Sequence, residues 1–168
     1  GCKEAERSWI ALALGSALPE CLDALRPLLL DENVHVRRLA IGALCNAIPP
    51  WACIDSTPAS VYYDWQKPYT PDWVLDIRSN AANPTTAALL RSLHDPDDLV
   101  RILAMKCVLG AGMRSPRVLA LLGEAPPGQT SNERAWRLAA INGLSASPEA
   151  ILDRLMLDAK STTERSTS

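Results

Sequence analysis

Several features that are absent from the sequence restrict its fold and its function. None of its 168 residues is phenylalanine, so its core has to be built from Leu, Ala, Val and Ile. No stretch approaches the roughly 18 consecutive apolar residues that a membrane-spanning helix requires. The net charge of -2 gives no field strong enough to hold a polyanion, so we expect no nucleic-acid partner.

The signatures of common catalytic and metal sites are also missing. The five cysteines form no C-x-x-C pair, which disfavours a zinc knuckle or a thioredoxin-like site. Gly110-Ala111-Gly112 is not followed by Gly-Lys-Ser or Gly-Lys-Thr, so it is read as a helix end and not as a phosphate loop. Asp95, Asp97 and Asp98 are clustered without the spacing of a calcium-binding loop. The sequence therefore predicts no metal, no cofactor and no catalytic residue.

The chain contains a short sequence motif in two close copies and one looser copy, which we call the repeated phrase. Each copy has an arginine followed three residues later by a small alanine, and the two close copies also have an aspartate six residues before the arginine. A unit that recurs in this way is typical of a fold made by stacking copies of one helical element. The positions are Asp31, Arg37 and Ala40; Asp95, Arg101 and Ala104; and, in the looser copy, Ser131, Arg137 and Ala140.

Apolar residues recur with helical spacing along almost the whole chain. They predict helices over residues 4–17, 20–30 with a kink at Pro27, 34–48 and 84–93. Further helices are expected after Asp97, from Ser115-Pro116, after a cap at Ser131, and from Ser147 onward. We expect one domain over residues 1–158 and a polar tail over 159–168 that frays.

Helix pairs with an aspartate in the turn and an arginine early in the second helix resemble the HEAT repeat. The closest form is the phycobilisome-lyase type, with its D-x-x-x-x-V-R-x-x-A core, over residues 20–47, 84–112 and 116–145. The resemblance implies an all-α, right-handed α-solenoid of about four antiparallel helix pairs. In such a stack Asp31 and Asp95 can accept from the N–H groups that open the next helix. Arg37 and Arg101 can reach the aspartate of the same or a neighbouring repeat, which predicts a ladder of charged hydrogen bonds with Arg137 in the matching place.

Residues 49–83 interrupt the repeat. The alanines at 104 and 140 lie 36 residues apart, near the roughly 40 of a HEAT repeat, whereas those at 40 and 104 lie 64 apart. Six of the eight aromatic residues fall in this proline-rich insertion, which we expect to be irregular. Either it binds another protein or it folds over the stack and buries its aromatics as a small core. The candidate binding residues are Trp51, Tyr62, Tyr63, Asp64, Trp65, Tyr69 and Trp73.

The cysteines leave two further alternatives open. The chain begins Gly1-Cys2, which resembles a bacterial lipoprotein at its processing site, with Cys2 lipidated, and also resembles a start with a leftover tag glycine. Cys21, Cys45 and Cys107 fall on apolar helix faces, where a thiol acts as a small hydrophobe. A bridge involving Cys53 is the pairing that the sequence leaves worth checking.

Together these patterns predict a non-enzymatic adaptor or scaffold subunit that binds another protein through a helical face and the insertion. A lipid on Cys2 would tether it to a bacterial cell envelope, and the membrane enters in no other way. The alternative is a small-molecule-binding or lyase-like enzyme whose insertion aromatics line a pocket, because HEAT-like phycobilin lyases handle a tetrapyrrole.

Overall fold

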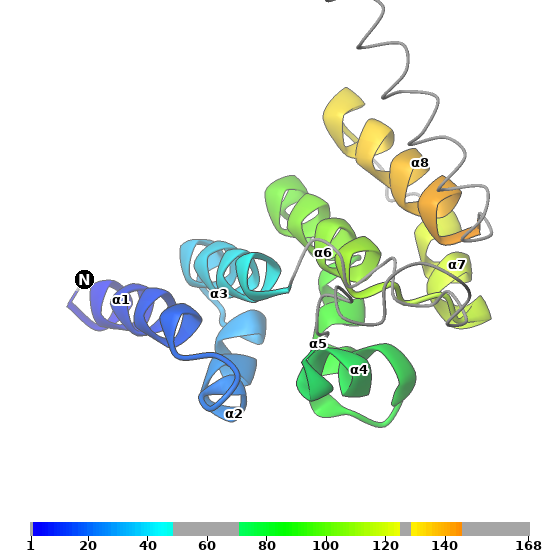
Figure 1. The fold of residues 1–168 in the computed structure, drawn as a ribbon. Coiled ribbons are helices and arrows are strands. Elements are labelled where there is room, and N and C mark those ends of the chain that lie inside the picture. Colours follow the sequence, from blue (N-terminus) through cyan, green and yellow to red (C-terminus); the bar gives the residue numbers. More distant parts are fainter. Residues whose placement is uncertain (1, 49–70, 125–128, 146–168) are drawn as a thin grey trace, which may run out of the picture.

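The computed structural model describes residues 2–48, 71–124 and 129–145, and these are all-helical. The described residues contain eight α-helices and one 3-10 helix, and the α-helices are labelled in Figure 1. Their bounds are α1 Cys2–Ser16, α2 Leu22–Leu25, η1 Arg26–Leu30, α3 Val34–Ala47, α4 Asp72–Ser79, α5 Pro84–Ser92, α6 Asp98–Ala111, α7 Pro116–Gly123 and α8 Ser131–Ser145. The predicted all-α class is confirmed for this part of the chain. None of the described helices is long and apolar enough to cross a membrane.

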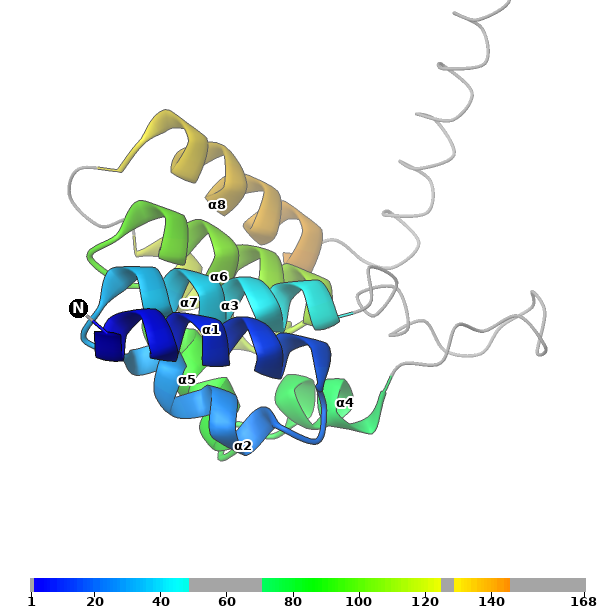
Figure 2. The same cartoon turned by 90° about the vertical axis from the view of Figure 1, so that its left-hand side faces the viewer.

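The longer helices form one layer. α1, α3, α6 and α8 lie side by side and run in the same direction, each packed on the next (Figure 2). The shorter helices lie beneath them: η1 packs on α3 and α5, α5 on α6, and α7 on α8. Because the first turns of α1, α3, α6 and α8 share one edge of the layer, side chains near those turns can meet across neighbouring helices.

The starts of the helices follow from local capping residues. The side chains of Asn33, Asp97 and Ser115 accept from the backbone N–H groups of His35, Val100 and Val118, at 2.8, 3.0 and 3.3 Å. Such caps satisfy N–H groups that have no partner within the helix. The cap predicted at Asp97 and the helix start predicted at Ser115-Pro116 are therefore confirmed.

The cap predicted at Ser131 is wrong by one residue. The Oγ1 atom of Thr130 accepts from the N–H of Glu133 at 3.2 Å, and the Thr130 carbonyl accepts from the N–H of Arg134. Either hydroxyl residue can cap a helix, so composition alone does not choose between two that are adjacent.

Two predicted elements differ from the structure. The helix expected over 20–30 is a short α2 followed by the 3-10 helix η1, which has Pro27 in its first turn. A proline ring disrupts the hydrogen bond of the turn before it, and the tighter 3-10 helix accommodates this. The insertion is not irregular throughout, because residues 72–79 form α4, which packs on α5 and α6. Residues 49–70, the helix expected from Ser147 and the tail over 159–168 lie outside the described residues.

The core runs along the junction of the two layers. It is made mainly of aliphatic side chains, as the absence of phenylalanine predicts. Among the largest fully buried side chains are Leu25, Ile41, Val74, Leu89 and Met105, which come from α2, α3, α4, α5 and α6 in that order. Apolar burial is worth about 25 cal/mol per Å², so this junction supplies the main stabilisation of the fold.

Candidate functional site

Charged side chains form a row along the edge where the layer helices begin. We call this row the arginine ladder: Arg7, Arg37, Arg101 and Arg137, with the carboxylates of Asp31, Asp95 and Glu133 between them. Arg7, Arg37 and Arg101 each face a carboxylate that lies in or near the first turn of the next layer helix, whereas Arg137 faces Glu133 of its own helix. The ladder therefore links α1 to α3, α3 to α6 and α6 to α8.

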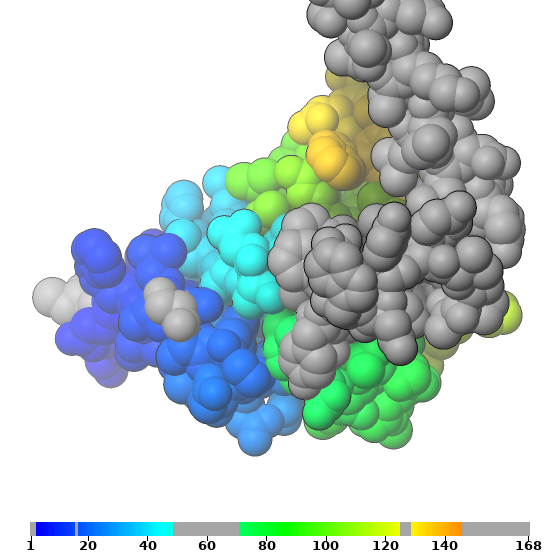
Figure 3. All heavy atoms as spheres, in the orientation of Figure 1, coloured from blue at the N-terminus to red at the C-terminus, as the bar shows by residue number. Residues whose placement is uncertain are grey.

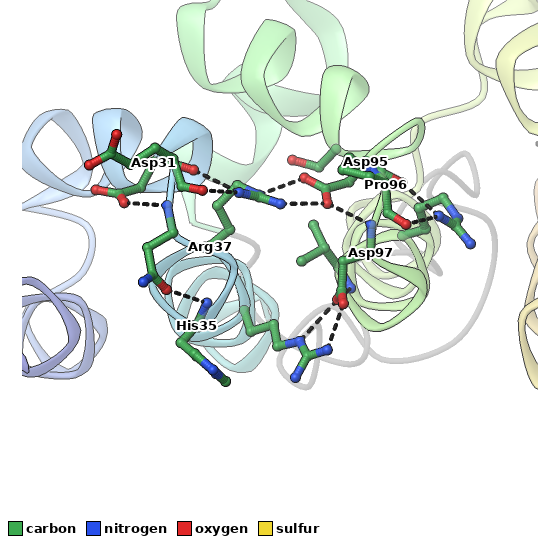
Figure 4. Close-up of polar contacts among 12 residues, drawn as sticks. Asp31, His35, Arg37, Asp95, Pro96 and Asp97 are labelled. Carbon is green, nitrogen blue, oxygen red and sulfur yellow. Dashed lines mark hydrogen bonds and ion pairs between the residues drawn. The ribbon is translucent and has the colours of Figure 1, made fainter. Parts of the chain in front are cut away.

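The step between α3 and α6 is the clearest (Figure 4). The Nε and Nη2 atoms of Arg37 donate to the two carboxylate oxygens of Asp95 at 2.7 and 2.9 Å. Its Nη1 donates backwards to the backbone carbonyls of Asp31 and Glu32, at 2.8 and 3.0 Å. The hydrogen bond with Asp95 raises the pKa of Arg37 above its ordinary value, so the guanidinium stays charged. One side chain thus fixes its own turn and the turn of the next repeat together.

The step between α6 and α8 uses a different acceptor. Arg101 donates from Nη1 to the carbonyls of Asp95 and Pro96, at 2.6 and 3.0 Å, just as Arg37 does in its own turn. Its Nε and Nη2, however, donate to Glu133 at 2.8 and 2.6 Å, and not to an aspartate side chain. Ser131 stands where the repeated phrase would place an aspartate, so the acceptor comes from the first turn of α8 instead.

Glu133 is the most enclosed charge of the ladder. Its side chain is 0% exposed, and those of Arg101 and Arg137 are only 6% and 5% exposed. Arg137 donates to Glu133 at 3.1 Å and to the carbonyl of Leu122 at 2.9 Å. Burial alone would raise the pKa of Glu133, but hydrogen bonds from both guanidinium groups outweigh it, so the pKa is lowered. Glu133 is therefore an ionised carboxylate held between two cations.

Two outer contacts extend the row. Arg7 of α1 forms an ion pair with Asp31 at 2.9 Å. Arg38, next to Arg37, donates from Nε and Nη2 to Asp97 at 3.0 and 2.5 Å. The hydrogen bond from Arg38 lowers the pKa of Asp97, whose Oδ1 also caps α6.

Sequence reasoning missed Arg7, Arg38 and Glu133, and the sequence carries a usable signal for one of them. Arg38 directly follows a repeat arginine, but the matching position after Arg101 is Ile102, so repetition gives no sign of it. Arg7 has no aspartate six residues before it, so its helix does not show the repeated phrase. Glu133 lies four residues before Arg137, the spacing at which a glutamate and an arginine meet on one helix face, and that pattern could have identified it.

The ladder accounts for the acidic residues that were the best candidates for chemistry. Asp95 accepts from Arg37 and also from the N–H of Asp97 at 2.9 Å, and Asp97 is held by Arg38. Carboxylates with such partners are committed to holding turns together and present few free lone pairs. Within residues 2–48, 71–124 and 129–145, no group of three or more His, Cys, Asp and Glu side chains could hold a metal ion.

Of the predicted binding residues, the structure places one. Trp73 lies on α4, half-buried, and packs against the hydrophobic core. α4 is fastened to α6 by Arg78, whose Nε donates to the carbonyl of Ala111 at 2.6 Å. Trp73 therefore contributes to the packing of α4 on the main hydrophobic core. The others lie outside the described residues: Trp51, Tyr62, Tyr63, Asp64, Trp65 and Tyr69.

The ends of the 49–70 segment are nevertheless well placed. The segment joins Ile48, buried at the end of α3, to Pro71 at the start of α4. Ile48 lies against Gly110 of α6, and α4 also packs on α6. Both ends are therefore held beside α6. Cys2 is the first residue of α1, and its side chain is not among those described, so its lipidation stays a prediction.

Comparison with known proteins adds no relative: no protein-family model, no curated protein and no solved structure matches this chain.

Proposed function

We propose that this chain is a non-enzymatic protein-interaction module, a small adaptor or structural subunit built as a HEAT-type α-solenoid of about four helix pairs. The observation that carries the proposal is the closure of the arginine ladder. Asp31, Asp95, Asp97 and Glu133 each hold an arginine, so two of the three clustered aspartates of the sequence, Asp95 and Asp97, have a structural role. Because these carboxylates already bind arginines within the fold, we expect a protein partner to be bound by the apolar and aromatic side chains on the surface.

The two-layer arrangement supports the solenoid part of the proposal. Each long helix contacts its neighbours in the layer, and the ladder repeats the same arginine-to-carboxylate contact from one helix to the next. Stacks in which each unit contacts only its neighbours present extended faces suited to holding another chain.

Helix α1 lies at one end of the described layer (Figure 3) and carries exposed apolar side chains. Trp9 is 72% exposed, and Ile10 and Leu12 on the same helix are 49% and 46% exposed. Tryptophan is enriched at the energetic centres of protein interfaces, because it joins a large apolar area to one polar N–H group. This cluster supports α1 as the helical face of the proposal.

The second element of the proposal is the aromatic segment between α3 and α4. Its candidate contacts are Tyr62, Tyr63, Asp64 and Trp65, with Trp51 and Tyr69 nearer its ends. Loops held at both ends by rigid elements commonly carry recognition. Anchorage of both ends beside α6 supports this use of the segment.

The proposal is tested by affinity capture from the native source followed by mass spectrometry. Four baits are compared: wild type, Trp9→Ala, the Tyr63→Ala/Trp65→Ala double variant, and Arg134→Ala as a control. Arg134 is exposed on α8, a helix that belongs to neither proposed contact region. We expect a stoichiometric protein with wild type and the control that is depleted by at least about tenfold with one or both aromatic variants, a loss of about 1.4 kcal/mol of binding free energy.

A protein captured equally by all four baits would contradict the proposed contact regions. If no protein is captured by the wild type, the adaptor proposal fails, and the small-molecule alternative becomes the better account of the aromatic segment. Thermal unfolding of each bait shows whether a loss of capture reflects a lost contact or a lost fold.

A further inference from the structure

Two cysteines meet across the interface of α3 and α6, and their meeting follows from a register that repeats along the layer. Positions can be counted from the ladder arginine of each helix. The residue eight positions after the arginine in one helix faces the residue six positions after the arginine in the next helix.

The two neighbouring interfaces establish this register. Between α1 and α3, a Cβ atom placed on Gly15 would lie 2.6 Å from the Cβ of Ala43. Between α6 and α8, a Cβ atom placed on Gly143 would lie 2.7 Å from the Cδ1 of Leu109. In both pairs the residue eight positions after the arginine of one helix faces the residue six positions after the arginine of the next. The same count at the α3–α6 interface gives Cys45 and Cys107.

Direct contacts agree with the register. Cys107 is fully buried, and its Sγ lies 3.7 Å from the carbonyl oxygen of Ile41, one helical turn before Cys45. Both thiols are in the free form, and Cys107 donates to the Ile41 carbonyl. Cys45 is only partly buried, so a small solute can reach one member of the pair.

The surroundings make the two sulfurs unequal. The adjacent Cys107 thiol lowers the pKa of Cys45 to about 7, burial opposes this, and the charge of Lys106 adds to the lowering. Lys106 is held in place by Trp136, whose ring centroid lies 4.5 Å from its Nζ. Burial and the adjacent Cys45 raise the pKa of Cys107. Cys45 is therefore ionised at a lower pH than an ordinary thiol, and the thiolate is the reactive form.

We propose that Cys45 is a peroxide-reactive thiol and that Cys107 is its resolving partner, so that oxidation joins α3 to α6 by a disulfide. In the first step the Cys45 thiolate attacks one oxygen of hydrogen peroxide. An S–O bond forms, the O–O bond breaks and hydroxide leaves, so the sulfur is oxidised to a sulfenic acid and the peroxide is reduced. In the second step the Cys107 sulfur attacks Cys45. The S–S bond forms as the S–O bond breaks, and the Cys107 proton leaves with the hydroxyl group as water.

The bridge would act close to the aromatic segment. Cys45 lies three residues before Ile48, where the 49–70 segment leaves α3, and Ile48 itself packs against Gly110 of α6. A covalent link here fixes α3 to α6 at the base of that segment. The inference does not depend on the proposed function, because it concerns only the thiols and their packing.

The test is mild oxidation of the reduced full chain with hydrogen peroxide, followed by peptide mapping under non-reducing conditions. In wild type we expect loss of two of the five thiols and a linked peptide pair containing Cys45 and Cys107. Cys107→Ser should leave a sulfenic acid on Cys45 that dimedone labels, and Cys45→Ser should abolish both products. Cys21→Ser, which changes a half-buried cysteine on another element, should react as wild type does.

A second measurement uses the unaltered protein, in case a variant fails to fold. Phenylarsine oxide bridges two thiols that lie side by side, so it should protect Cys45 and Cys107 together from alkylation. Oxidation of Cys45 no faster than of Cys21, or a bridge from Cys45 to Cys53 or Cys2, would overturn the assignment. So would a wild-type protein in which phenylarsine oxide protects neither thiol.

Discussion

The buried end of the arginine ladder provides the sharpest test of how this fold is held together. In Arg101→Ala, Glu133 loses two hydrogen bonds of 2.8 and 2.6 Å and keeps the contact with Arg137 at 3.1 Å. Removing one partner of a buried ion pair costs about 3–5 kcal/mol, because the other charge stays buried without its counterion. Since Arg137 still partly compensates Glu133, we expect about 3 kcal/mol for Arg101→Ala.

The opposite truncation should cost more. Glu133→Ala leaves the guanidinium groups of Arg101 and Arg137 buried side by side without the carboxylate that separates them. Their carbonyl acceptors remain, but two like charges then face each other, so we expect the upper part of the range, about 4–5 kcal/mol. A domain of this size loses about 2–4 °C of melting temperature per kcal/mol.

The measurement is urea unfolding of wild type, both single variants and the double variant. If the pair is coupled, the double variant should be more stable than the sum of the single losses predicts, by at least about 1 kcal/mol. Arg134→Ala, on the exposed side of α8, should leave the unfolding midpoint unchanged. Additive single losses, or an Arg101→Ala protein as stable as the control, would refute the view that the ladder holds α6 to α8.

Three further predictions follow from the described contacts. Gly15→Ala should destabilise the fold by about 1–3 kcal/mol, because its new Cβ meets the Cβ of Ala43 at 2.6 Å. Gly42→Ala places its Cβ in open space and should stabilise the fold by up to about 1 kcal/mol. Equal melting temperatures of the two variants would contradict the close approach of α1 and α3. Gly112→Ala should cost about 1 kcal/mol in denaturant unfolding, because Gly112 ends α6 with a φ of 68°, and a gain in stability would show that the turn relaxes. The folded-state pKa of Glu133 lies below its ordinary value of 4.5, so the unfolded chain binds more protons as the pH falls through that value and stability is lost in acid. Unfolding measured between pH 3 and pH 7 should show this loss in wild type and a shallower one in Glu133→Gln, and two parallel curves would contradict it.

Much of the fold could be predicted because its determinants lie close together in sequence. Asp97 and Ser115 cap helices through N–H groups three residues away, so residue type and position suffice to find them. α4 was missed because residues 72–79 follow a proline-rich stretch, and the apolar pair Val74 and Ile77 is too short to show helical periodicity on its own. The helix forms where those two side chains are buried against the stack.

The sequence alone determined that the chain is helical, where most helices begin, and which arginines and aspartates stand at equivalent points of its repeated phrase. It could not determine which side chains meet, because that depends on the register between helices and not on spacing within one. In the folded chain Arg37 donates to Asp95, as the repeated phrase predicts. Arg101 instead donates to Glu133, 32 residues further along the chain. The same register set Cys45 against Cys107, two thiols that the sequence presented as separate small hydrophobes. Capping is decided within one helical turn, whereas these pairings require neighbouring helices to be packed in place, and only the folded chain holds that information.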